Sequence, residues 1–208
     1  MDETNSKLTA RLETPIEPTL LVPLLSVLNE SELYATWLPS WTKPVRLGVR
    51  SSHKLQQNGR CNQTILVTTD IPWPLSTREV IIDALACDDI DANSNIAIKL
   101  KTLEPGEQMG SPGGQSATVP LPGEGSVRID FDGGFLIRRC PTDHPALVEV
   151  RENKNCLLVS FAMFVDAKVK FLPVSVINFI VRTVIGRMWD MFLRVAEDIR
   201  EGKRPQHA

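Results

Sequence analysis

The sequence predicts an α+β fold in which a curved antiparallel sheet wraps around one long C-terminal helix. The stretch from Phe171 to Arg200 repeats apolar residues at three- and four-residue steps, as one face of an amphipathic helix does. About six segments between Val45 and Val169 alternate apolar and polar residues as strands do. Short turns separate most of these segments, which favours antiparallel neighbours.

The composition is that of a globular protein built as one domain. The chain has 208 residues, of which 42% are hydrophobic and 23% are charged. Its formal net charge of −2 provides no strongly basic surface, so we expect no nucleic-acid partner. We expect a single domain at residues 6–201, with a disordered segment at 1–5 before it and a tail at 202–208 after it, acting as a monomer.

The sequence also predicts a cytoplasmic protein without a metal or a cofactor. The N-terminus is polar and lacks the apolar segment of a secretory signal. Segment 89–94 begins like a calcium loop, but Ser94 replaces the required Gly and Leu100 the terminal Glu, so we expect an ordinary acidic turn. The cysteines are far apart and form no zinc or disulfide pattern, which predicts reduced core residues at Cys61, Cys87, Cys140 and Cys156.

The first forty residues predict one strand followed by two short helices. Ser6–Glu13 alternates in the manner of a strand, and Thr19–Leu28 is apolar and helical in character. A second helix is expected at Ser31–Leu38, with Ser31 as a possible cap of its first turn.

The middle of the chain predicts the rest of the sheet. Asn58-Gly59 is a hairpin signal between the first two strands of this region, and Gly133-Gly134 predicts a bulge or a bend. A small strand is also expected at Ala146–Val150. The main strands are expected at Val45–Gln57, Cys61–Ile71, Glu79–Cys87, Asn95–Leu103, Val127–Arg139 and Leu157–Val165.

One segment, residues 104–125, is dense in Gly, Pro and Ser and predicts a flexible loop. Little in it could offset the entropy lost on ordering it.

The last helix is expected to lie against the sheet and to leave a tunnel there, because a curved sheet is wider than one helix can fill. The alternative is a filled core. Charged residues, among them Arg182, Arg187 and Asp190, interrupt its apolar run well below the roughly 20 residues that a bilayer requires.

The segment PWPLSTREVII, Pro72–Ile82, resembles the START domain, the lipid-transfer module of the helix-grip superfamily. Trp37–Trp41 and Phe171–Pro173 are similar to segments of that family in the same order, and the resemblance covers roughly residues 8–199. The long Gly/Pro loop departs from the family pattern. The resemblance implies a helix-grip fold with a hydrophobic cavity that shields one lipid and that loops and the C-terminal helix gate.

Candidate site residues fall into two groups. Exposed aromatic and basic residues of the last helix would contact an anionic membrane transiently, and these are Phe179, Arg182, Trp189 and Arg194. Residues expected to bind the ligand are Trp73, Arg78, Ile98, Phe131, Phe135, Phe161, Met163, Val165, Ile177, Val181, Val184 and Met188. Arg78 must be paired if buried, and Asp83, Asp130 or Asp132 could serve.

The favoured function is therefore a non-enzymatic lipid carrier or sensor that holds one lipid or other hydrophobic molecule. A second hypothesis is a helix-grip enzyme of the cyclase or hydrolase type, which would need an acid or base inside the tunnel. None of the three histidines lies in a nucleophile or metal motif, so we expect no catalytic residue. A third hypothesis is an interaction domain with a filled core and no ligand.

Overall fold

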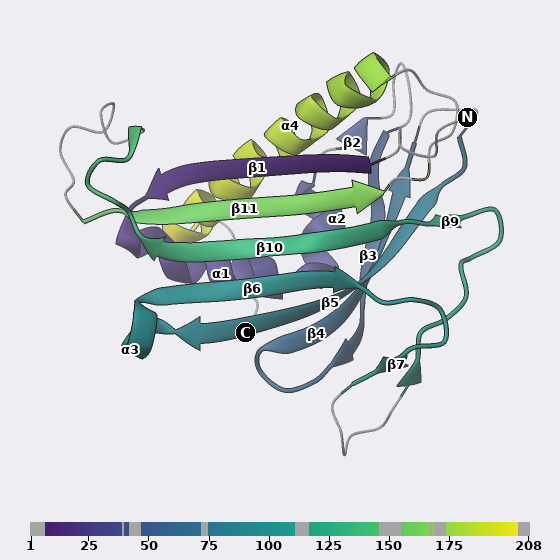
Figure 1. Ribbon diagram of the computed structural model, residues 1–208, viewed down its shortest axis with the longest axis horizontal. Helices are drawn as coiled ribbons and strands as arrows, with labels where there is room; N and C mark the ends of the chain where they lie inside the picture. The colour runs from purple at the N-terminus through teal and green to yellow at the C-terminus, as the bar shows by residue number, and fades with distance from the viewer. Residues whose placement is uncertain are drawn as a thin grey trace.

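The computed structural model is a curved sheet with helices against one face (Figure 1). It describes residues 7–38, 40–41, 47–71, 75–110, 117–145, 155–166, 168 and 174–203. The expected disordered segment at 1–5, the end of the tail at 204–208 and the small strand at Ala146–Val150 lie outside these residues.

Nine strands of the described chain form the main sheet, in the order β1-β11-β10-β6-β5-β4-β3-β2, with β9 beside β5. All neighbours are antiparallel except the short parallel pair of β5 and β9. The strands are β1 (Lys7–Ile16), β2 (Ser40–Trp41), β3 (Leu47–Gln57), β4 (Asn62–Asp70), β5 (Arg78–Asp89), β6 (Asn95–Thr102), β9 (Val127–Arg128), β10 (Asp130–Arg139) and β11 (Leu157–Asp166).

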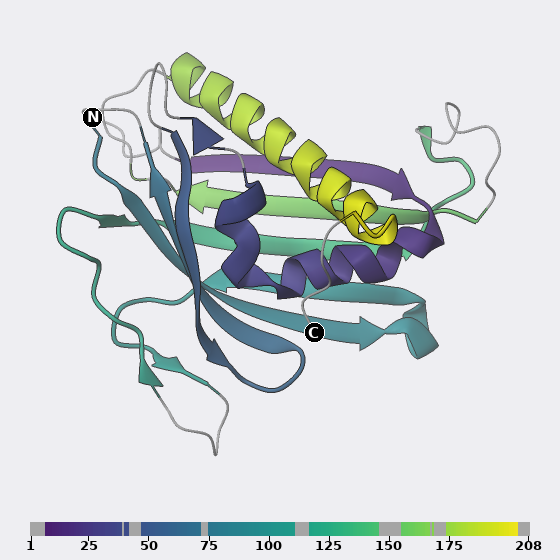
Figure 2. The same ribbon diagram turned by 180° about the vertical axis from the view of Figure 1, so that it is seen from behind.

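The helices lie on the concave side of this sheet (Figure 2). After β1 come the 3-10 turn η2 (Pro18–Leu20), α1 (Leu21–Asn29), the 3-10 turn η3 (Ser31–Leu33) and α2 (Tyr34–Trp37). The long helix α4 (Val174–Arg200) packs against α1 and α2, and a single turn of helix, α3 (Ile90–Asn93), joins β5 to β6 at the expected acidic turn. The main core lies between α4 and the inner face of the sheet.

The predicted fold class is confirmed, and each of the six main strands is present within a few residues of its expected bounds. Of the bulge or bend expected at Gly133-Gly134, the bulge is absent, because the register of β10 with β11 and β6 runs through both residues without a shift. The two glycines instead permit close contact. A Cβ on Gly134 would lie 2.1 Å from the Ile98 carbonyl oxygen, a distance that no side chain could adopt.

The described parts of residues 104–125, the predicted flexible loop, include secondary structure and buried side chains. They form a two-stranded ribbon of β7 (Gln108–Met109) and β8 (Ala117–Thr118). Met109 is 5% exposed and Val119 is 3% exposed, and both pack against Ile81 of β5 in a second, smaller core. We call this ribbon with its flanking residues 104–110 and 117–125 the outer arm.

Candidate ligand-binding cavity

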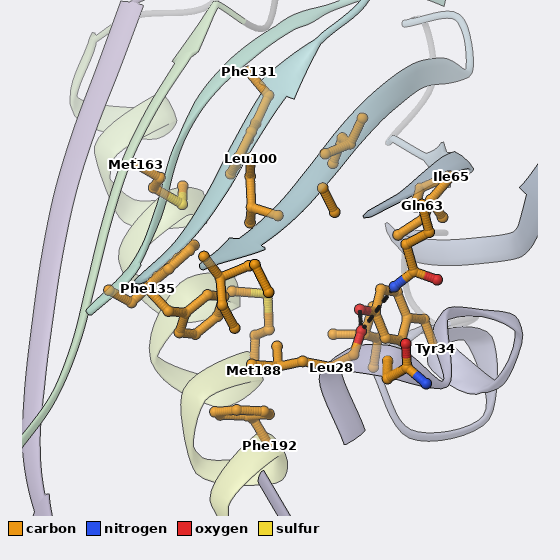
Figure 3. A pocket seen from close by; sticks show the side chains of 18 of the residues that line it. Leu28, Tyr34, Gln63, Ile65, Leu100, Phe131, Phe135, Met163, Met188 and Phe192 are labelled. Carbon is orange, nitrogen blue, oxygen red and sulfur yellow. Dashed lines mark hydrogen bonds between the residues drawn. The ribbon is translucent and has the colours of Figure 1, made fainter. Parts of the chain in front are cut away.

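A cavity of about 750 Å³ lies between the inner face of the sheet and the helices α1, α2 and α4. Figure 3 shows residues from all of these elements pointing into it. Its volume falls within the range of roughly 300–1,000 Å³ that is typical of sites for small molecules. The helices and sheet therefore do not fill the space between them.

The wall formed by the sheet follows from strand alternation, since every second side chain of a strand points to the same face. On β4 the alternation brings Gln63, Ile65, Val67 and Thr69 to the cavity. On β5 it brings Val80, Ile82, Ala84 and Ala86, and on β6 it brings Ile96, Ile98 and Leu100. Most of this wall is aliphatic and offers a ligand apolar contact only.

The helical wall is centred on Ile185, Trp189 and Phe192. These residues follow one another at intervals of about one turn of α4, so they lie on the same face of the helix. The Trp189 indole stacks on Phe161 with a centroid distance of 6.3 Å, and its Nε1 donates a hydrogen bond of 2.8 Å to the Thr14 hydroxyl. Phe161 in turn stacks on Phe135 at 4.5 Å. These aromatic contacts close one side of the cavity.

The burial of Trp189 corrects the expectation that it faces the membrane. Only 7% of its surface is exposed, and the neighbouring Leu193 also packs against the main core. The buried face of α4 therefore includes Trp189 beside Ile185 and Phe192, because indole is mostly apolar and its single N–H is satisfied by Thr14.

A polar cluster interrupts the apolar wall where α1 and α2 meet β4. The Tyr34 hydroxyl donates a 2.6 Å hydrogen bond to the Leu28 carbonyl, and Gln63 Nε2 donates to the same oxygen at 3.3 Å. Gln63 Oε1 accepts a hydrogen bond from the Ser31 hydroxyl at 3.3 Å. Burial raises the pKa of Tyr34, so its phenol stays protonated. We call these groups, Ser31, Tyr34, Gln63 and the Leu28 carbonyl, the Gln63 cluster.

The Gln63 cluster was not expected from the sequence. Ser31 was expected as a possible helix cap, but Glu30 occupies the cap position of η3, and the fully buried Ser31 hydroxyl donates to Gln63 instead. The alternation of Gln63 with Ile65 and Val67 does contain the signal, because it predicts that Gln63 faces the same side as these two apolar residues.

The cavity opens where its lining residues are exposed to solvent. These residues lie on α1, in the β3–β4 turn and near the end of β5, and they are Val22, Asn29, Arg60, Cys61 and Asp88. Arg60 and Asp88 are the charged side chains of the described wall. Charge is therefore confined to the rim in the part of the wall that the structure describes.

Seven of the twelve expected ligand-binding residues line the cavity: Ile98, Phe131, Phe135, Phe161, Met163, Val184 and Met188. Val165 packs against the main core but is outside the described wall. Trp73, and the side chains of Ile177 and Val181, lie outside the described residues.

Arg78 is buried but is also outside the described wall. Its guanidinium donates hydrogen bonds to the backbone carbonyls of Ser76 and Lys168, and burial lowers its pKa. Asp130, one of the three carboxylates expected for it, pairs with the Lys168 ammonium at 3.1 Å. The polar spot of the described cavity is therefore the Gln63 cluster rather than Arg78.

The expected membrane residues Arg182 and Arg194 are exposed on α4, and the side chain of Phe179 lies outside the described residues. In the described chain, no helix combines the length and the apolar character needed to cross a membrane. Nor do the described residues include a group of three or more His, Cys, Asp and Glu side chains placed to hold a metal ion. Of the four cysteines expected in the core, Cys140 and Cys156 are buried, whereas Cys61 and Cys87 are exposed.

Comparison with solved structures identifies the fold. Human STARD10 superposes with a TM-score of 0.62 and 17% identity, covering 97% of this chain and 68% of that protein. The STAR-related lipid transfer protein fragment from Xanthomonas axonopodis gives 0.61 and 17%, covering 94% and 89%. Human StAR-related lipid transfer protein 5 gives 0.61 and 13%, covering 96% and 86%. No family model and no curated protein matches the sequence.

Proposed function

The chain has the START fold, and from its cavity we propose that it binds one lipid or similar hydrophobic molecule and carries it between membranes. The observation that supports this proposal most directly is the cavity of about 750 Å³ with its largely apolar wall. An empty apolar space of this size forgoes the contacts that packed side chains would make, whereas an apolar ligand would restore them. Two of the similar structures are named as lipid transfer proteins.

Native mass spectrometry of the purified protein, followed by lipid extraction, tests the proposal. We expect either a stoichiometric lipid on the purified protein or its uptake after the delipidated protein is mixed with vesicles. A protein with no bound mass and no uptake would contradict the carrier function and favour an interaction domain.

We further propose that α4 holds the carrier against anionic membranes during transfer. Arg182 and Arg194 are exposed on this helix, and a basic side chain near an anionic surface contributes about 1 kcal/mol. Replacing both with alanine would then weaken membrane binding by roughly 30-fold at low salt.

Vesicle transfer assays can test this docking surface. Transfer by the natural protein should rise with anionic lipid content and fall with added salt, and Arg182→Ala with Arg194→Ala should slow it without weakening equilibrium lipid binding. Lys99→Ala with Lys101→Ala is a matched control, because it removes the same charge from the opposite face of the sheet. Equal slowing by both double variants would show that net charge, not α4, controls transfer.

A further inference from the structure

Gln63 is a buried polar side chain at the cavity wall, with hydrogen-bonding capacity left over. It is 6% exposed, and Figure 3 shows it reaching from β4 toward Tyr34 and Leu28. The Leu28 carbonyl can only accept hydrogen bonds, which fixes Nε2 as the atom that faces it. Oε1 then faces the Ser31 hydroxyl.

The Gln63 cluster leaves both a donor and acceptors open to the cavity. Leu28 takes one of the two hydrogens on Gln63 Nε2, and the second has no partner among the described residues. The Tyr34 hydroxyl gives its hydrogen to Leu28, so its oxygen can still accept. Buried donors and acceptors are nearly always satisfied in proteins, so this position favours a ligand atom that both donates and accepts.

The positions of the charged side chains around the cavity indicate which ligand groups could bind at the Gln63 cluster. In the described wall, charged side chains occur at the rim only, as Arg60 and Asp88. A carboxylate or phosphate at the Gln63 cluster would lose its hydration without meeting a cation there, which is strongly unfavourable. An ether can accept but not donate, whereas a hydroxyl does both and is uncharged.

Resting on the lipid-binding function proposed above, we propose that the cavity selects an uncharged lipid with a hydroxyl head group, which binds at the Gln63 cluster. The hydroxyl oxygen accepts from Gln63 Nε2, and its hydrogen goes to the Tyr34 oxygen or to Gln63 Oε1. The hydrocarbon part then extends toward Phe135 and Met188, which line the opposite side of the cavity in Figure 3.

Three probes with the same hydrocarbon chain test this selection on delipidated protein. Oleyl alcohol, its methyl ether and oleate are compared by isothermal titration calorimetry. We expect the alcohol to bind roughly tenfold more tightly than the ether, because the ether leaves an acceptor of the cluster without a hydrogen. Oleate, measured where it is ionised, should bind more weakly than the alcohol.

Gln63→Leu should remove the preference for the alcohol over the ether while leaving ether binding within about twofold. Thr69→Val is the matched control, because Thr69 is another inward-facing polar residue of β4 but lies outside the cluster, and it should retain the preference. If Gln63→Leu does not fold, Tyr34→Phe removes the phenolic acceptor and should reduce the preference.

The outcomes separate this inference from the function on which it rests. Failure of all three probes to bind would contradict the lipid-binding function itself. Binding of alcohol and ether with equal affinity would refute the hydroxyl selection alone. Tighter binding of oleate would also refute it, and would place the head group at the rim near Arg60.

Discussion

Substitutions at Val80 and Ile81, which are neighbours on β5, can test whether the cavity has room for a larger side chain. Val80 is 8% exposed and lines the cavity on the inner face, whereas Ile81 is fully buried on the outer face against Met109 and Val119 of the outer arm. We consider replacing each of them with phenylalanine. The two variants differ only in which face of one strand receives the ring.

The expected effects on stability have opposite signs. Phenylalanine has about four more carbon atoms than valine, and at about 0.8 kcal/mol per buried methylene their burial in the cavity contributes at most about 3 kcal/mol. With losses of β propensity and rotamer freedom, we expect Val80→Phe to stabilise the empty protein by about 1–2 kcal/mol. Ile81→Phe overpacks a filled region and should destabilise by about 1–3 kcal/mol.

Thermal unfolding of the delipidated variants measures this difference. For a chain of this size, 1 kcal/mol corresponds to about 2–4 °C in Tm, so Val80→Phe should raise Tm by roughly 2–8 °C and Ile81→Phe should lower it by roughly 2–12 °C. Val80→Phe should also reduce uptake of a fluorescent lipid, because the ring occupies part of the cavity. A fall in Tm for both variants would show that the inner face is as densely packed as the outer one, and the reasoning from cavity volume would be wrong.

Three further tests use substitutions elsewhere in the structure. Burial raises the pKa of Asp83 above 3.8, which disfavours its ionised form in the folded state, so Asp83→Asn should raise the free energy of unfolding at pH 7. The gain should shrink as the pH falls through the raised pKa toward 3.8, and a gain that is constant with pH would exclude this cause. Gly134→Ala should destabilise by about 1–3 kcal/mol or more in urea unfolding, whereas Gly186→Ala on α4, where a Cβ meets no atom within 4 Å, should stabilise by about 0.5–1 kcal/mol. Met109→Ala should cost about 2 kcal/mol or more if the outer arm is packed as described, while Leu121→Ala at an 80% exposed site should change the same measurement by less than about 0.5 kcal/mol.

The strands and the long helix could be predicted because their patterns are local. Alternation along Asn95–Thr102, for example, both identifies β6 and shows that Ile98 faces inward. The same rule extends to the cavity wall on neighbouring strands, since paired residues share a face. The sheet and its inner surface therefore follow from sequence with little further information.

Which face of α4 packs against the sheet was less predictable, because aromatic and aliphatic residues occur around most of the circumference of this helix. Trp189 follows Met188 directly, and both contact the cavity, so periodicity alone permits two stripes that differ by one position. The choice between them depends on Thr14 of β1, which accepts the indole hydrogen from 175 residues away. A local pattern does not contain that contact.

Packing between distant segments also explains the outer arm. Its composition predicts flexibility, yet two apolar residues in it, Met109 and Val119, cover Ile81. Met109 and Val119 are separated in sequence by the Gly- and Pro-rich stretch between them, so no periodic signal marks them as partners. Only the outward position of Ile81, an apolar residue between two inward-facing ones, indicates that something must cover that face.

The position of β1 at one edge of the sheet sets an order on the assembly of the protein. Its neighbour is β11, and Glu13 of β1 receives a hydrogen bond from Ser160, 147 residues later. During synthesis, β1 therefore lacks its pairing partner until nearly the whole domain has been made. By contrast, β3 to β6 can pair as each strand follows the last, because they are neighbours both in sequence and in the sheet. Closing so long a loop is slow, and until it closes the first strand presents an unpaired edge to chaperones and to other chains.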